Sequence, residues 1–140
     1  RSRDDDAANA RIRLEGVDQG EDAGGLIALD RNDLRVLVLL AQATRRGQRV
    51  TVPATALAQA IRRPARQARL SRLVRQASTD LAPLDGPDAT RVGVLLATSR
   101  TADIVDAHVV VCARRTAQSI VTSDPHDLRR LDPSLRLVVV

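Results

Sequence analysis

Two aspartates three residues apart, Asp103 and Asp106, stand just before the apolar run at 109–112. Residues spaced i and i+3 share one face of a helix, so both carboxylates are expected together in the first turn of a helix over 101–115. The apolar run predicts that this helix is buried. Carboxylates at the edge of a buried helix suit either a helix cap or a bound cation.

Further acids stand where strands are expected to end. Asp124 closes the predicted strand 118–124, and Asp22 stands at a predicted strand–helix junction. In a doubly wound sheet, ligands bind beyond the carboxyl ends of the strands, where the strand order reverses. Carboxylates that converge there repel one another unless a cation neutralises them, and hard ions such as Mg²⁺ or Mn²⁺ prefer oxygen ligands. Such a cluster suits metal-assisted attack on a phosphodiester.

A simpler interpretation competes with the metal cluster. Aspartate is a common N-cap, so Asp103 can serve only to cap its helix. Asp124 stands before Pro125 and can be a turn or cap residue. Spacing alone leaves both interpretations open.

The elements that must position these acids alternate along the chain. Strands are predicted over 10–17, as a short edge strand, and over 49–53, 80–85, 118–124 and 135–140. Helices are predicted over 25–30, 34–46, 54–63, 65–77, 86–100, 101–115 and 125–131. Asn32 or Asp33 is expected to cap the helix at 34, and Gly47 to follow its end. This alternation predicts an α/β fold with a central, mostly parallel sheet.

Composition narrows the classes of partner. The 140 residues include no Phe, Trp, Tyr or Met, so the core must be built from Leu, Val, Ile and Ala, and base-stacking RNA platforms are disfavoured. All 22 basic residues are Arg, and the net charge of +5 favours an anionic partner, nucleic acid first, while a merely solvated basic surface stays an equal alternative. The lone Cys112 is expected in the core of a protein in a reducing compartment. With no apolar stretch able to span a bilayer, we expect a cytoplasmic protein without membrane contact.

Three segments together resemble a PIN domain, specifically the VapC-type toxin ribonucleases of toxin–antitoxin pairs. DAGGLIALDRND (22–33) resembles the opening motif of the family, and VTVPATALAQAIR (50–62) its second block. DIVDAHVVVCARRTAQSIVTSDPHDLRRL (103–131) resembles its closing half. The resemblance covers 22–140, which we interpret as a PIN-like domain preceded by a polar extension, residues 1–21, that is disordered or altered.

The resemblance implies a three-layer fold and a Mg²⁺- or Mn²⁺-dependent endoribonuclease. It also implies a homodimer and a cognate antitoxin that blocks the active site. By position, Asp22, Asp106 and Asp124 match family acids, Asp103 is an additional acid, and Thr122 matches a hydroxyl that helps to hold the cluster. We expect the RNA substrate to contact Thr122, Ser123, Arg62, Arg66 and Arg69. The Arg-rich segment 62–75 is equally compatible with a solvated helix face or with a surface that binds the antitoxin.

The chain departs from the family in two places. Gln59 stands where the family has a Glu; its amide oxygen can still bind metal but carries no charge, and Asp103 is expected to compensate. The residues before Asp22, GVDQGE, cannot supply the apolar central strand of the family. That strand is then formed by nearby residues such as Ile12, Leu14 and Val17, or the N-terminal sequence is altered.

The sequence therefore predicts a metal-dependent endoribonuclease, with two alternatives. One is a PIN-like module that has lost catalysis and binds RNA or a protein, which Gln59 and the missing strand favour. The other is a plain α/β domain whose acids are only caps and turns.

Overall fold

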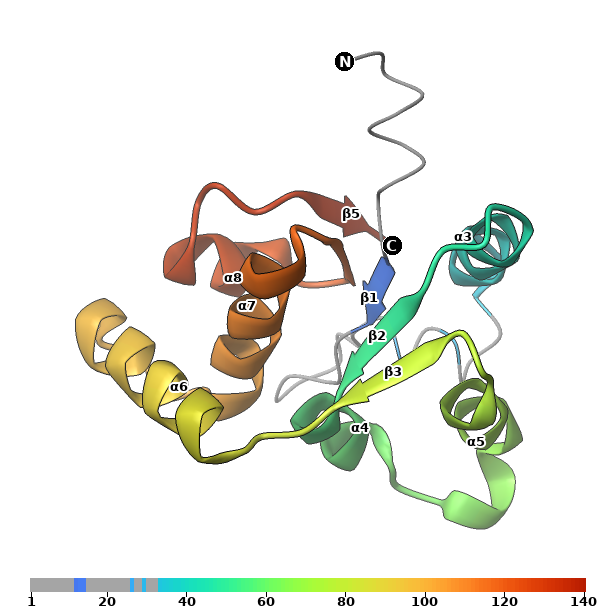
Figure 1. Cartoon of the computed structure of the whole chain (residues 1–140), viewed down its shortest axis with the longest axis horizontal. Helices are drawn as coiled ribbons and strands as arrows, with labels where there is room; N and C mark the ends of the chain where they lie inside the picture. Colours follow the sequence, from blue (N-terminus) through green and yellow to red (C-terminus); the bar gives the residue numbers. More distant parts are fainter. Residues whose placement is uncertain (1–11, 15–25, 27–28, 30–32) are drawn as a thin grey trace.

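The computed structural model describes residues 12–14, 26, 29 and 33–140 (Figure 1). Its centre is a parallel five-stranded sheet with the strand order β3-β2-β1-β4-β5. The strands are β1 (Ile12–Leu14), β2 (Val50–Pro53), β3 (Thr79–Ala82), β4 (Ser119–Thr122) and β5 (Leu137–Val139). The predicted α/β class and parallel sheet are confirmed.

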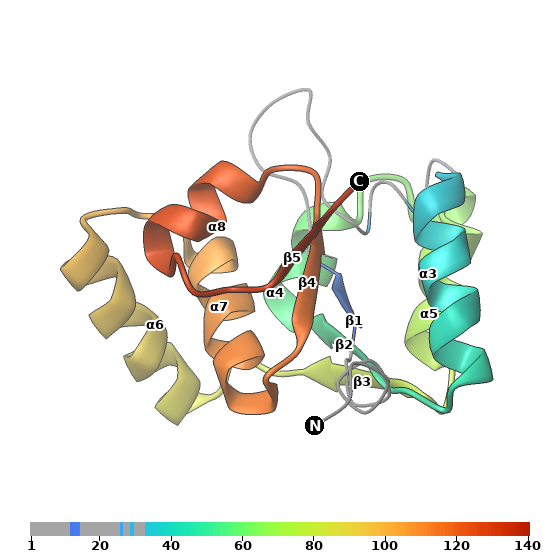
Figure 2. The same ribbon diagram turned by 90° about the horizontal axis from the view of Figure 1, so that it is seen from above.

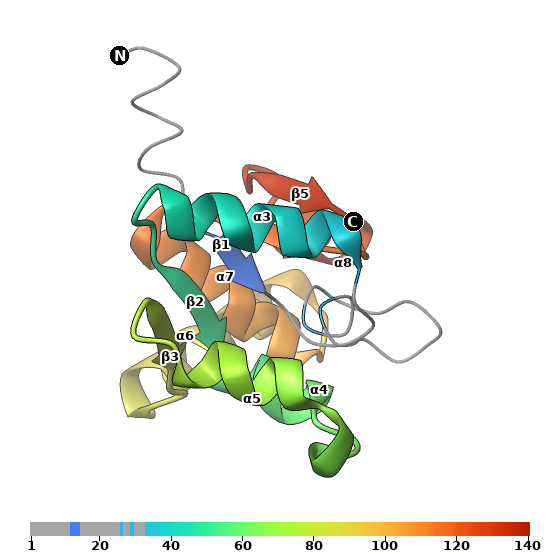
Figure 3. The same ribbon diagram turned by 90° about the vertical axis from the view of Figure 1, so that its right-hand side faces the viewer.

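Helices lie on both sides of this sheet. They are α3 (Leu34–Arg45), α4 (Ala54–Ala60), the 3-10 helix η1 (Pro64–Arg66), α5 (Ala68–Arg75), α6 (Gly86–Ser99), α7 (Ile104–Thr116) and α8 (Pro125–Leu131). Figures 2 and 3 show α3 and α5 on one side of the sheet and α6 and α7 on the other. None of the helices in the described part of the chain is long and apolar enough to cross a membrane.

Strand β1 occupies the middle of the sheet. Ile12 pairs with Val50 of β2 and with Ser119 of β4, so both backbone edges of β1 are engaged. The prediction of an edge strand at 10–17 was therefore wrong, whereas the prediction that nearby residues such as Ile12 and Leu14 supply the central strand is confirmed. Alternation of polar and apolar residues reports which faces of a strand meet solvent, whereas the neighbours of a strand depend on long-range pairing that alternation does not encode.

Local capping explains where α3 begins and ends, and it confirms the prediction there. Asp33 accepts a hydrogen bond from the backbone N–H of Arg35 at 2.9 Å. After the C-cap residue Arg46, Gly47 adopts a φ of +65°, the left-handed conformation that costs glycine least. The other predicted cap, Asn32, lies outside the described residues.

The predicted helix over 54–63 is shorter in the structure, because α4 ends at Ala60. The buried side chain of Gln67 satisfies the backbone groups at the break. Its Nε2 donates to the carbonyl of Ala60 at 3.0 Å, and its Oε1 accepts from the N–H groups of Arg62 and Arg63 at 2.9 and 3.0 Å. These side-chain bonds take the place of further helical turns, so the chain turns before Pro64.

Helix α7 is the most deeply buried helix of the described chain. Every residue from Asp106 to Ala113 is buried, and the helix packs against α4, α6, α8 and strands β2 and β4. Aliphatic side chains such as Val52 and Ile120 on the sheet are also fully buried. Cys112 belongs to this buried run, as predicted.

An ion-paired aspartate joins α6 to α7. Asp88 accepts hydrogen bonds from the guanidinium groups of Arg115 on α7 and, at 2.9 Å, of Arg91 one turn along α6. The two arginine side chains are 49% and 61% exposed, and they cover a carboxylate that is itself only 3% exposed. The hydrogen bond from Arg115 is the main cause of a lowered pKa at Asp88, with Arg91 adding to it against the opposing effect of burial.

Replacing Asp88 by Asn should destabilise the protein in a pH-dependent way. Because the folded-state pKa of Asp88 lies below the ordinary value of 3.8, its stabilisation is present above that value and is lost as the pH falls through the folded-state pKa. We expect a loss of about 1 kcal/mol near neutral pH, discounted because both arginines are half exposed. The difference should shrink below about pH 4.

Urea unfolding measures the free energy of unfolding at neutral and at acidic pH. It is followed by far-ultraviolet circular dichroism, because this signal needs no aromatic residue. Asp80→Asn, which breaks the more exposed pair between Arg49 and Asp80, is the matched control and should cost less. A loss for Asp88→Asn that is the same at neutral and acidic pH would contradict an ionic origin.

Candidate acidic site at the carboxyl edge of the sheet

The order of the strands reverses between β1 and β4. From β1 the chain proceeds outward to β2 and β3 on one side, and β4 and β5 lie on the other. Ligand sites of parallel α/β sheets form at the carboxyl ends of the strands at such a reversal. In this chain, that position is marked by the end of β4 at Thr122.

The first turn of α7 lies at this same edge. Helix α7 ends at Thr116, just before β4 begins at Ser119, so it runs opposite to β4 and starts beside the carboxyl end of that strand. Figure 2 shows this end of α7 next to the start of α8. The first turn of α7, which contains Asp106 as predicted, and Asp124, which follows β4, therefore lie at the same edge of the sheet.

Asp103 is the N-cap of α7. Its Oδ1 accepts a hydrogen bond from the backbone N–H of Asp106 at 3.0 Å. This geometry agrees with the capping interpretation, and it occupies one carboxylate oxygen. The cap uses only this oxygen, so the second carboxylate oxygen of Asp103 can take another role, such as contact with a cation.

Asp106 and Asp103 line a small hollow with an acid that sequence reasoning missed. The hollow has a volume of about 190 Å³, and Asp127 and Arg130 of α8 complete its polar wall. Asp106 is only 9% exposed. Asp127 and Arg130 are spaced i and i+3 on a helix that packs on α7. This spacing puts both side chains on one helix face, and it is the sequence feature that could have indicated them.

The residues that follow β4 lie near the edge but do not line this hollow. Thr122 is fully buried, and its Oγ1 accepts a hydrogen bond from the N–H of Asp124 at 2.9 Å. Asp124 stands at the N-cap position of α8, yet its side chain makes no capping bond. The Oγ of Ser123 is buried without a hydrogen-bond partner among the described residues.

Gln59 lies half-buried on α4, the helix that packs against α7. It stands four residues after Thr55, whose Oγ1 lies 2.6 Å from Nδ1 of the fully buried His108. Residues four apart share a helix face, so Gln59 lies on the side of α4 that meets α7. It does not line the acidic hollow.

The three arginines predicted to contact RNA are exposed and lie apart from the hollow. Arg62 donates to the carbonyl of Ile61 at 2.9 Å. Arg69 lines a separate groove between α3 and α5 together with Arg72. Arg66 ends η1. None of the three is among the residues that line the acidic hollow.

The described residues do not by themselves complete a metal site. No group of three or more His, Cys, Asp or Glu side chains able to hold a metal ion occurs within 12–14, 26, 29 and 33–140. Asp22, the first predicted ligand, lies outside the described residues. The oxygen donors present suit Mg²⁺ or Mn²⁺ in kind, and a site would need a carboxylate from the segment that follows β1.

Comparisons with known proteins found no matching family model, no matching curated protein and no matching solved structure. The functional argument therefore depends on the residues and geometry of this chain.

Two substitutions of Asp103 should separate its capping role from its charge. Asp103→Ala removes the cap and should cost about 1 kcal/mol, whereas Asp103→Asn retains a good cap and should cost much less. Thermal unfolding followed by circular dichroism measures both. Asp85→Ala is the matched control, because Asp85 caps α6 in the same way, accepting from the N–H of Asp88 at 2.9 Å. Equal losses for Asp103→Ala and Asp103→Asn would contradict the capping role.

Proposed function

We propose that this chain is a metal-dependent endoribonuclease of the PIN type, similar to the VapC toxins. The observation that carries the proposal is the position of Asp106, a carboxylate only 9% exposed at the carboxyl edge of a parallel sheet beside the reversal of strand order. This edge is where parallel sheets bind their ligands.

Asp22, Asp106 and Asp124, assisted by Asp103, would hold the Mg²⁺ or Mn²⁺. The carboxylate of Asp124 supports this role, because it makes no capping bond at the start of α8. One oxygen of Asp103 is used by the cap of α7, so Asp103 is an auxiliary ligand. Gln59 would approach from α4 through its amide oxygen.

A bound Mg²⁺ or Mn²⁺ would supply the Lewis acidity for attack of water on a phosphodiester. The residues of the chain would position the acidic cluster and bind the RNA. Thr122 holds the backbone of Asp124 through its hydroxyl, and Ser123, which is half-buried beside Asp124, would contact the substrate. Arg62, Arg66 and Arg69 would neutralise the RNA backbone, in keeping with the net charge of +5.

The further features of the proposal follow from the resemblance to the family. They are a three-layer arrangement of the PIN type, a homodimer, a cytoplasmic location and a cognate antitoxin that blocks the acidic site. The helices on both sides of a parallel sheet support the first of these (Figure 3).

The alternative function is a PIN-like module that binds RNA or a protein without cleaving it. Two observations favour it: Gln59 replaces a charged ligand, and the described residues contain no complete group of metal ligands. The two functions differ in whether any RNA cleavage depends on metal and on Asp106.

Asp106→Asn should abolish metal-dependent RNA cleavage. The substrate is a mixed structured RNA, incubated with Mn²⁺, with Mg²⁺ or with EDTA and analysed on denaturing gels. We expect cleavage by the wild-type chain with metal only, and a loss of about 100-fold or more in the variant, equivalent to several kcal/mol of lost transition-state stabilisation. Asp80→Asn, outside the acidic hollow, is the control that should retain activity.

The wild-type chain decides between the two functions. A folded wild-type chain that binds this RNA but does not cleave it would favour the binding module. Cleavage that persists in EDTA or in Asp106→Asn would contradict the proposed mechanism. Because the chain lacks Trp and Tyr, its concentration is set by amino-acid analysis.

Gln59→Glu should tighten Mn²⁺ binding. The substitution restores a negative charge on the face of α4 that meets α7, so the site gains a charged oxygen ligand, and we expect an increase in affinity of about tenfold. Titration calorimetry measures it. Gln42→Glu adds the same charge on α3 and should leave the affinity unchanged. An affinity unchanged by Gln59→Glu would show that Gln59 does not face the metal.

A further inference from the structure

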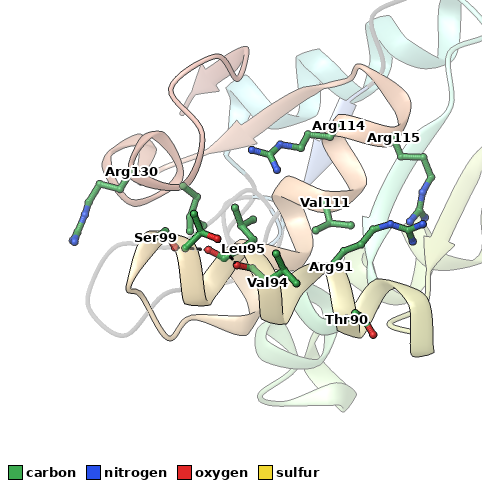
Figure 4. A pocket seen from close by; sticks show the side chains of 11 residues that line it. Thr90, Arg91, Val94, Leu95, Ser99, Val111, Arg114, Arg115 and Arg130 are labelled. Atoms are coloured by element: carbon green, nitrogen blue, oxygen red, sulfur yellow. Dashed lines mark hydrogen bonds between the residues drawn. The ribbon is translucent and has the colours of Figure 1, made fainter.

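A second hollow surface, the α6–α8 groove, lies between α6, α7 and α8. Its volume is about 950 Å³. Figure 4 shows the side chains that line it, with Val94 and Leu95 on α6 and Val111 on α7. None of the roles assigned above uses this groove.

The floor of the α6–α8 groove is aliphatic. Val94 is 62% exposed, although it is a valine on a helix, and Leu95, Val111 and Leu131 lie with it in the groove. Burial of such a surface is favourable by about 25 cal/mol for each Å². The groove therefore suits a partner that presents apolar side chains.

The walls of the α6–α8 groove are positively charged. Its lining includes four arginines and no carboxylate: Arg91, Arg114, Arg115 and Arg130. The acids that partner them lie outside the lining, with Asp88 shared by two arginines and Asp132 bonded to one at 2.8 Å. Four positive guanidinium groups are thus balanced by only two carboxylates, which leaves an excess of positive charge along the groove. Arg130 forms no ion pair with another described residue, and Figure 4 shows it extending outward.

We propose that the α6–α8 groove binds an acidic amphipathic helix of a partner protein. Apolar side chains of the helix would cover Val94 and Leu95, and flanking carboxylates would pair with the arginine walls. Helix α6 has 14 residues, about 21 Å at 1.5 Å per residue, so the partner helix would contact it over about four turns.

Two other occupants fit the groove less well. A second copy of this chain carries a net charge of +5 and would add positive charge to a positive groove. Single-stranded RNA would meet the arginines, but the aliphatic floor contains no aromatic ring on which a base could stack. Charge and apolar surface together favour the acidic helix.

Binding in this groove has a consequence for the acidic hollow. Arg130 and Leu131 line both the groove and the hollow that contains Asp106. A helix that pairs with Arg130 would therefore lie at the rim of the hollow and restrict access of RNA. This consequence, unlike the binding itself, depends on the proposed ribonuclease function.

The test uses a synthetic amphipathic peptide of about 18 residues, enough to span α6. It carries leucines at i, i+3, i+4 and i+7 on one face, glutamates on the flanks and one tryptophan. Since the chain has no Trp or Tyr, the fluorescence of the peptide reports its binding without background. EDTA in the buffer separates this measurement from any metal-dependent activity.

We expect saturable binding to the wild-type chain, weakened about tenfold or more by Val94→Glu and severalfold by Arg130→Gln. Leu34→Glu is the matched control for the first variant, because Leu34 on α3 is 73% exposed; Arg45→Gln is the control for the second. Neither control should change the affinity. A peptide with lysines in place of the glutamates should not bind.

Failure of the glutamate peptide to bind the wild-type chain would overturn the proposal, as would an equal loss of affinity in Leu34→Glu. Binding of a single-stranded RNA that Val94→Glu weakens, without binding of the peptide, would assign the groove to nucleic acid instead. Peptide binding by a chain that cleaves no RNA would reject the ribonuclease but not the groove. Where cleavage occurs, the peptide should inhibit the wild-type chain and not Val94→Glu.

Discussion

The burial of α7 is the constraint on which the rest of the structure depends. Eight consecutive residues, Asp106 to Ala113, are shielded from solvent, so the helix must be surrounded on every side. Strands β2 and β4 and helices α4, α6 and α8 provide that enclosure. Because aliphatic side chains form nearly all of the contact, the position of α7 on the sheet is set by packing, and the place of Asp106 follows from it.

A carboxylate at the start of such a helix is acceptable for a specific reason. The first turn of a helix has free N–H groups and a partial positive charge, and both favour an acid there. Asp103 uses this directly as the cap. Asp106 stands one turn further in and is only 9% exposed. The cap itself requires only Asp103, so Asp106 is the acid of this turn to which the proposed function assigns a separate role.

Much of this arrangement could be predicted from the sequence because it depends on local patterns. The cap at Asp33, the glycine after α3, the Pro87 start of α6 and the burial of Cys112 all follow from a few adjacent residues. The central position of β1 does not follow from the local alternation at 10–17, since it depends on pairing with β2 and β4; only the resemblance to the family indicated it. The end of α4 at Ala60 was missed for a related reason: Gln67 supplies the bonds that replace the helix.

The short helix α8 shows why the site was only partly predictable. Two of its polar residues, Asp127 and Arg130, reach the hollow at the start of α7 through tertiary packing, and no motif in α7 indicates them. Arg130 then serves two surfaces, because it lines both the acidic hollow and the α6–α8 groove. Under the two proposals together, an acidic helix that pairs with Arg130 would lie at the rim of the acidic hollow. Such a partner would reduce access to Asp106 without contacting that residue.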